Sequence, residues 1–132
     1  MAETTHMDRE ALAKCKPQVA AVEIPGHGTA YVRGMDGAQR DQLELMMAES
    51  ERDGERDVRR VSGFRTKLVL WCACDLNGGL LYDADNPDDD KEVAGLDAVV
   101  RDRLAEAVLE ASGLGDAVVK DDAGNSGGAP SD

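Results

Sequence analysis

Two groups of β-branched and aromatic residues flank the break PGHG at residues 25–28. Short apolar segments on both sides of a Gly/Pro turn are typical of two antiparallel strands. The pattern therefore predicts a β-hairpin in which residues 19–24 pair with residues 29–33.

The next segment changes to helical spacing. Asp36 is suited to cap a helix, because its carboxylate can accept hydrogen bonds from the free amides of the first turn. Leu43, Met46 and Met47 then recur three or four residues apart, and Gly54 is a natural end point. These features predict a helix between Asp36 and Gly54.

The stretch from residue 57 to residue 75 fits two structures. Val58, Val61, Leu68 and Trp71 keep a spacing of three to four residues, which favours one long amphipathic helix, although a glycine interrupts it. The continuous apolar run LVLWC that begins at Leu68 also fits a buried strand. We prefer the helix, and the strand stays open.

Two further breaks follow, NGG at residues 77–79 and NP at residues 86–87. The apolar residues between them, 80–82, predict a short extended piece whose side chains lie under the domain.

From Asp88 the spacing is helical again, with acidic residues in the first turn, where the helix dipole favours them. Gly113 lies where a helix would end, and residues 114–120 could add one further short helix. The apolar stripe of the predicted helix consists of Val93, Leu96, Val100, Leu104, either Ala107 or Val108, and Ala111.

These segments predict a mostly helical α+β fold, with an N-terminal β-hairpin followed by three or four helices. We expect a flexible leader over residues 1–18, with a helical turn or two between residues 8 and 14. A single domain would cover residues 19–120. Residues 121–132 are rich in Gly, Ser, Ala and Asp, and we expect a disordered acidic tail.

Charge narrows the classes of partner. Fifteen basic residues against 27 acidic ones give a net charge of −12, which repels nucleic acid and anionic membranes. We therefore expect neither as a partner. The charge is uneven, because the middle of the chain is locally basic. Such a distribution suits contact with protein surfaces of mixed charge. The basic residues are Arg52, Arg56, Arg59, Arg60, Arg65 and Lys67.

Cys72 and Cys74 could contribute to a soft-metal or redox site, or could be small buried hydrophobic residues. A structural zinc site needs four ligands at characteristic spacings, and no further Cys or His lies at such a spacing. We therefore favour packing. The aspartates between 75 and 90 depart from the calcium-loop pattern, so we interpret them as a solvated turn and helix start.

Catalytic motifs are weak as well. His27 lies in a Gly-rich turn without the frame of a phosphate-binding loop, and the serines occupy no nucleophile elbow. We expect no enzyme activity, no catalytic residue, no cofactor and no metal. The methionines around Met46 are either core filler or part of an adaptable groove for apolar helices.

The order of four stretches resembles that of the tail assembly chaperones of long-tailed, siphovirus-type bacteriophages. They are VEIPGHGTAYVRGM, GAQRDQLE, RTKLVLWCACDLNGGLLYDADN and LAEAVLEASGLGDAVV. The positions that match the motifs of this family are Arg33, residues 65–82 and residues 104–115. The resemblance covers about residues 20–120.

The resemblance implies a protein without enzyme activity that binds the tape measure protein, keeps it soluble and recruits tail tube subunits. It implies action in the host cytoplasm, absence from the mature virion and a possible longer form made by frameshifting. A small acidic virion component, such as a head-tail connector or minor tail protein, is the alternative. Partner-binding residues are predicted at Leu43, Met46, Met47, Leu68 and Trp71.

Overall fold

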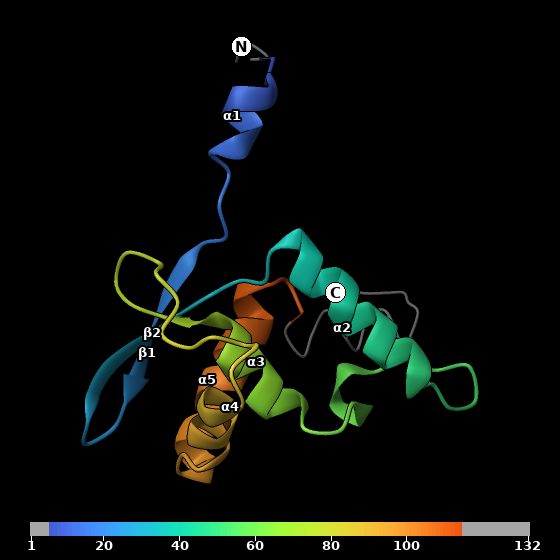
Figure 1. The fold of residues 1–132 in the computed structure, drawn as a ribbon, viewed down its shortest axis with the longest axis vertical. Helices are drawn as coiled ribbons and strands as arrows, with labels where there is room; N and C mark the ends of the chain where they lie inside the picture. Colours follow the sequence, from blue (N-terminus) through green and yellow to red (C-terminus); the bar gives the residue numbers. More distant parts are fainter. Residues whose placement is uncertain (1–5, 115–132) are drawn as a thin grey trace, which may run out of the picture.

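The computed structural model describes residues 6–114. In this part of the chain an N-terminal hairpin is followed by four α-helices, which confirms the predicted α+β class (Figure 1). The predicted tail over residues 121–132 and the proposed domain end at residue 120 lie outside the described residues. The elements are α1 (Arg9–Ala13), β1 (Val19–Ile24), β2 (Gly28–Arg33), α2 (Gly37–Glu49), the 3₁₀ helix η1 (Val58–Arg60), α3 (Phe64–Cys72), β3 (Ala73–Cys74), α4 (Pro87–Ala94) and α5 (Ala98–Ala111).

The hairpin forms as the sequence predicts. Its antiparallel register runs from Val19 opposite Arg33 to Ile24 opposite Gly28. Pro25 fits the first central position of the turn, and the next residue, Gly26, has a φ of 81°, as a type II turn requires. β3 adds to the other side of β2, so the sheet order is β1-β2-β3.

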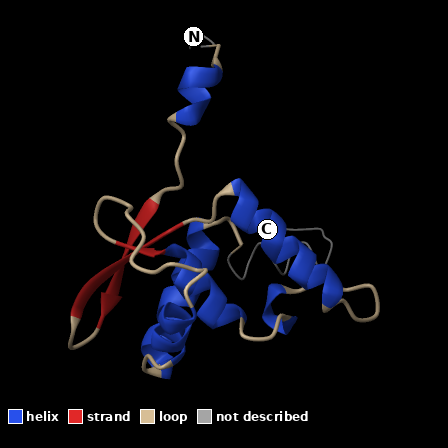
Figure 2. Ribbon diagram, viewed as in Figure 1, coloured by secondary structure: helices blue, strands red, loops and turns tan. Residues whose placement is uncertain are grey.

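One apolar core joins the sheet to the helices. α5 packs against β1, β2 and α3, and α4 packs against α3 (Figure 2). Side chains of both strands alternate between this core and the opposite face of the sheet, because successive residues of a strand point to opposite sides. The largest fully buried side chains are Leu43, Leu68, Leu109, Val32, Val58, Val69, Val93, Val108, Cys72 and Cys74.

The long helix predicted from Val58 is wrong in its first half. After η1, Val61 has extended backbone, and Gly63 has a φ of 68°, a left-handed conformation that breaks the helix. The helical interpretation holds for α3, and the strand interpretation holds only for the two residues of β3. Since apolar spacing continues across the break, periodicity alone could not show it.

The single helix predicted from Asp88 is also wrong, because α4 and α5 are separate. The break lies at Gly95 and Asp97, and the Asp97 carboxylate accepts hydrogen bonds from the backbone amides of Val99 and Val100. The predicted end is confirmed, since Gly113 has a φ of 77° directly after α5. The further short helix predicted over residues 114–120 lies almost entirely outside the described residues.

α2 begins at the predicted cap but ends before Gly54. Asp36 and Gln39 form a capping box, in which each side chain bonds the backbone amide of the other residue. The helix stops at Glu49. Asp53 and Gly54 then take positive φ values in a tight turn, which reverses the chain toward η1.

The leader contains the predicted short helix, α1, which is capped by the Asp8 side chain. α1 buries none of its residues and stands away from the rest of the molecule (Figure 1). Met7 is 50% exposed and Leu12 is 58% exposed, so the leader carries apolar side chains that the described fold leaves uncovered.

Candidate protein-binding surfaces

The five predicted partner-binding residues divide into two groups. Leu43, Leu68 and Trp71 are buried in the core, so in this conformation they support the fold instead of forming a contact surface. Met46 and Met47 are half-buried and pack against the edge of that core. Only the α2 methionines therefore remain available to a partner at the surface.

α2 carries accessible apolar side chains. Apart from its first turn, it contacts the rest of the fold mainly at η1 (Figure 1). Leu45 on this helix is 61% exposed and lies next in sequence to Met46 and Met47. They point about 100° apart around the helix, and we call these three residues the α2 apolar group.

A second apolar surface lies on the outer face of the sheet. The loop after β3 reaches Val19, because a Cβ built on Gly78 would lie 3.3 Å from a Val19 methyl. The backbone amides of Asn77 and Gly79 both donate to the Asp75 carboxylate, which fixes the turn. The exposed apolar residues of this loop are Leu76, Leu80 and Leu81, and together with Val19 of β1 we call them the loop patch.

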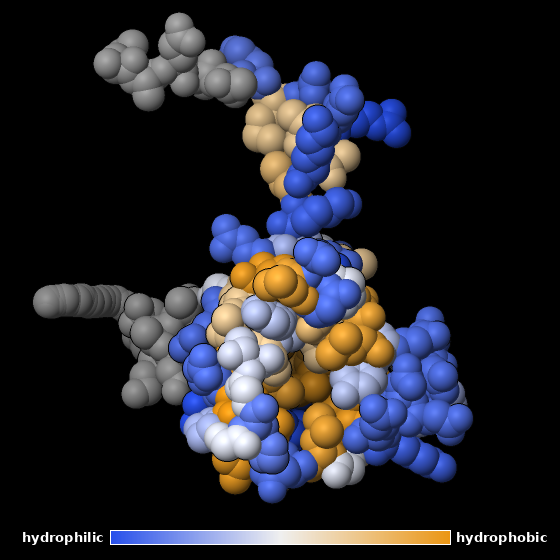
Figure 3. Space-filling view, turned by 90° about the vertical axis from the view of Figure 1, so that its left-hand side faces the viewer, coloured by the Kyte–Doolittle hydropathy of each residue, from blue (hydrophilic) through white to orange (hydrophobic). Residues whose placement is uncertain are grey.

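The loop patch corrects the prediction that residues 80–82 tuck under the domain. Leu80 pairs with Cys74 in an isolated bridge, yet its side chain is 44% exposed, and Leu81 is 58% exposed. Only Tyr82 packs against the core. Hydrophobic side chains border a hollow on the face of the molecule shown in Figure 3.

The thiols of Cys72 and Cys74 are packed in the interior of the protein. Cys72 is fully buried, and desolvation raises the pKa of its thiol to about 12. Burial also raises the pKa of Cys74. In the described part of the chain, no group of His, Cys, Asp and Glu side chains comes together as a metal site would need. These thiols are protonated at neutral pH, which is the inert form.

The acidic residues before and within α4 organise the backbone. Asp83 accepts from the amide of Asp85, and Asn86 caps α4. Burial, and then the carboxylates of Glu92 and Asp89, raise the pKa of the Tyr82 hydroxyl. These carboxylates therefore leave a negative surface at this end of the molecule.

The basic middle of the chain is largely neutralised by its neighbours. Arg59 pairs with Glu106 of α5 at 3.2 Å, and Arg65 lies 3.5 Å from Asp102 of the same helix. Arg56 pairs with Glu51, and Arg60 pairs with Glu55. These arginines join η1 and α3 to nearby acidic groups, so they do not form an open basic surface.

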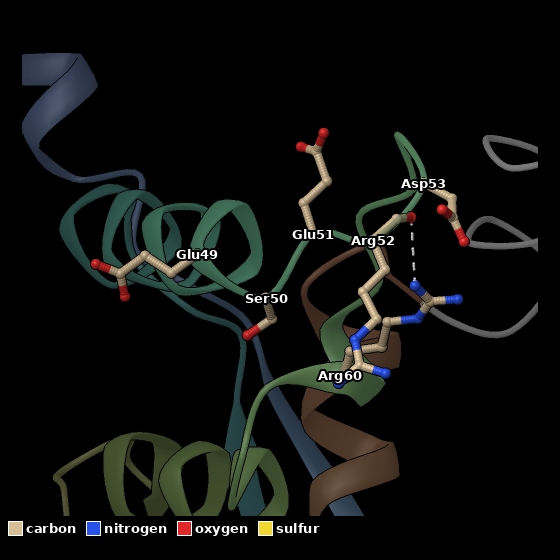
Figure 4. Close-up of a pocket in the computed structure, with 6 residues that line it drawn as sticks. All are labelled: Glu49, Ser50, Glu51, Arg52, Asp53 and Arg60. Carbon is tan, nitrogen blue, oxygen red and sulfur yellow. Dashed lines mark hydrogen bonds between the residues drawn. The ribbon is translucent and has the colours of Figure 1, made fainter.

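A polar hollow of about 670 Å³ lies between the end of α2 and η1 (Figure 4). In Figure 4 the Glu49 and Glu51 carboxylates point apart, and Arg60 reaches the backbone oxygen of Arg52, 3.5 Å away. Ser50 has carboxylates and arginines around it. The two histidines lie elsewhere, His6 before α1 and His27 in the hairpin turn. The side chains of the hollow do not converge on one point as a catalytic group would.

Comparison with protein-family models, curated proteins and solved structures gives no match for this chain. Among residues 6–114, no helix has both the length and the apolar character needed to cross a membrane.

Sequence reasoning did not single out two features of these surfaces. Gln39 donates from its side-chain amide to the Trp71 carbonyl at 3.2 Å, which joins α2 to α3. The spacing Asp-x-x-Gln at Asp36 is a capping-box signal that could have located it. The exposure of Leu76, Leu80 and Leu81 depends on how the loop folds over the sheet, for which local sequence carries no signal.

Proposed function

We propose that this chain is a tail assembly chaperone of a siphovirus-type bacteriophage, which binds the tape measure protein while the tail is built. The order of its motifs supports this function. A second observation supports the proposal most strongly: the chain is strongly acidic, yet it leaves several leucines uncovered.

The physical role follows from that combination. Apolar surface on a long helical polypeptide causes aggregation unless something covers it. The loop patch and the α2 apolar group can cover such surface, while the acidic residues around α4 stay in water and repel other coated chains. A protein of this kind acts by contact and needs no chemical step.

The remaining parts of the proposal follow the resemblance. The coated tape measure protein would recruit tail tube subunits in the host cytoplasm, and the chaperone would leave before the virion is complete. A frameshifted longer form would supply additional copies with an extended C-terminus.

Co-expression with the tape measure protein tests the proposal. The soluble fraction of the tape measure protein is measured with wild-type chain, without it, and with Leu76, Leu80 and Leu81 all changed to Ser. Ala94→Ser is the matched control, because Ala94 is exposed and lies outside both apolar surfaces. We expect wild type and the control to keep the tape measure protein soluble and the triple variant to lose most of this effect.

Equal solubility with and without the chain would overturn the proposal. Mass spectrometry of purified mature particles provides the second test. A stoichiometric amount of this chain in the particles would instead favour a small structural virion component.

A further inference from the structure

β1 is an edge strand with one free side among the described residues. The amide of Gly34 donates to the carbonyl of Gln18, so these two residues form a hydrogen-bonded pair of the ladder. Such pairs alternate along an antiparallel ladder, which places the backbone groups of the even-numbered β1 residues toward β2. Those of Val19, Ala21 and Glu23 therefore point away from the sheet.

This free edge has little protection. Pro, charged side chains and bulges are the usual devices that stop edge strands from pairing, and of these the strand VAAVEI has only one charged residue, Glu23. The only hydrogen bond to these outward groups within residues 6–114 comes from Arg103, which donates to the Glu23 carbonyl at 3.3 Å. A bond of this length to an exposed side chain is weak and easily displaced.

We propose that β1 pairs antiparallel with β1 of a second copy of this chain, about a two-fold axis at Ala21. In this register Val19 of each copy faces Glu23 of the other, and Ala21 faces its own equivalent. All three outward residues then find partners for both their amide and their carbonyl. The charged residue of the strand faces valine and never another glutamate.

The same pairing gives the leader a place to bind. Because the strands are antiparallel, the leader of one copy runs toward the hairpin turn of the other. A pocket of about 390 Å³ opens there, between the turn and the first turns of α5. It is lined by Ile24, Pro25, His27, Asp97, Val99, Val100 and Arg103.

The length of the leader fits this arrangement. In the proposed register Pro17 of one copy lies opposite Pro25 of the other. Leu12 is five residues further along, which spans at most about 17 Å of extended chain. Met7 and Leu12, which the described fold leaves exposed, can reach the apolar pocket, and Lys14 and Lys16 can approach Asp97 on its rim. A second copy thus supplies both a matching strand and an apolar arm.

The net charge of each copy makes this dimer depend on the salt concentration. Each copy carries a net charge of −12, so the two bodies repel. The edge itself carries one acidic side chain, Glu23, and the basic Arg103 reaches the backbone carbonyl of the same residue. The acidic start of α4 belongs to a helix that packs on α3. Salt screens the long-range repulsion, so dimerisation should become tighter as salt rises.

Charge-swap variants at Ala21 test the register. The Ala21 side chain is exposed on the outer face, and its backbone does not bond β2, so Ala21→Lys and Ala21→Glu should both fold as monomers. Sedimentation equilibrium of the purified full chain should show a wild-type dimer, with dimerisation weakened at least about tenfold in each variant. Mixing the two variants should restore a dimer, because lysine then faces glutamate.

The contact of the leader with the pocket has its own test. Leu12→Ser combined with Met7→Ser should weaken dimerisation several-fold, while Ala13→Ser on the same helix should leave it unchanged. A wild-type chain that stays monomeric from micromolar to millimolar concentration would overturn the proposal, as would Ala21 variants that dimerise like wild type. These measurements need no tape measure protein, so their outcome is independent of the proposed chaperone function.

Discussion

α3 and α2 are neighbours in the chain, yet they meet opposite environments. α3 buries six of its nine residues, including Leu68, Trp71 and Cys72, whereas α2 buries only Leu43 out of thirteen residues. A helix that is apolar over most of its circumference belongs in a core, and one that is mostly polar belongs at a surface. Substitutions at most α3 positions should therefore damage folding, whereas substitutions at the exposed positions of α2 should leave the stability of the fold nearly unchanged.

The two helices are nevertheless joined at one point. The Gln39 side chain closes the capping box of α2 and also donates to the last turn of α3 through the Trp71 carbonyl. The first turn of α2 is therefore fixed, while the α2 apolar group lies further along the helix. Four predictions test this division.

The largest effect is expected from Leu68→Ala. Leu68 is completely buried, so removing its side chain leaves a cavity and should lower the free energy of unfolding by about 2–5 kcal/mol. Urea denaturation measures this change. Leu45→Ala on α2 is the control and should stay within roughly 0.5 kcal/mol of wild type. Equal losses in the two variants would contradict the contrast between the helices.

A smaller loss is expected from Gly34→Ala, at the joint between the hairpin and α2. A Cβ at this position would lie 2.7 Å from the Ala111 carbonyl oxygen, which is backbone and cannot move aside alone. We expect about 1–3 kcal/mol of destabilisation in the same denaturation assay. Gly37→Ala should be neutral or slightly stabilising, because a Cβ added there would meet nothing within 4 Å.

The local parts of this architecture could be predicted from sequence, and the long-range parts could not. The hairpin, the Asp36 cap and the Gly113 end depend on residues that act within a few positions of themselves. The breaks at Gly63 and Asp97 were missed, since the apolar spacing continues through both. Three of the five predicted binding residues are buried in the core, which the sequence could not show, because a pattern that marks Leu68 as apolar cannot say whether a neighbour covers it.

Asp36→Ala should act on α2 alone. Loss of the side-chain acceptor leaves an amide of the first turn unpaired, which typically costs about 1 kcal/mol. Native-state hydrogen exchange should show faster exchange in α2, with α3 protected as in wild type. Asp41→Ala is a matched control, because Asp41 is exposed and lies beyond the cap. Equal acceleration in α3 would mean that the two helices unfold together.

The smallest effect on stability at neutral pH is expected from the thiols. Iodoacetamide at pH 8 should modify the exposed Cys15 and leave Cys72 and Cys74 unmodified until the chain is denatured. Above pH 9 the unfolded chain loses the Cys72 proton, while burial keeps it on the folded chain up to a pKa of about 12. Stability should therefore fall as pH rises through this window, and less so in Cys72→Ala.

The contact between the end of α5 and the hairpin affects when the protein can complete its fold during synthesis. The Met35 amide donates to the Ser112 hydroxyl across 77 positions of sequence, and α5 covers the apolar side of the strands. During translation the hairpin leaves the ribosome long before α5 is synthesised. The apolar face of the hairpin is therefore exposed first to water or to a nascent-chain chaperone. Completion of the fold should therefore wait until synthesis has passed residue 112.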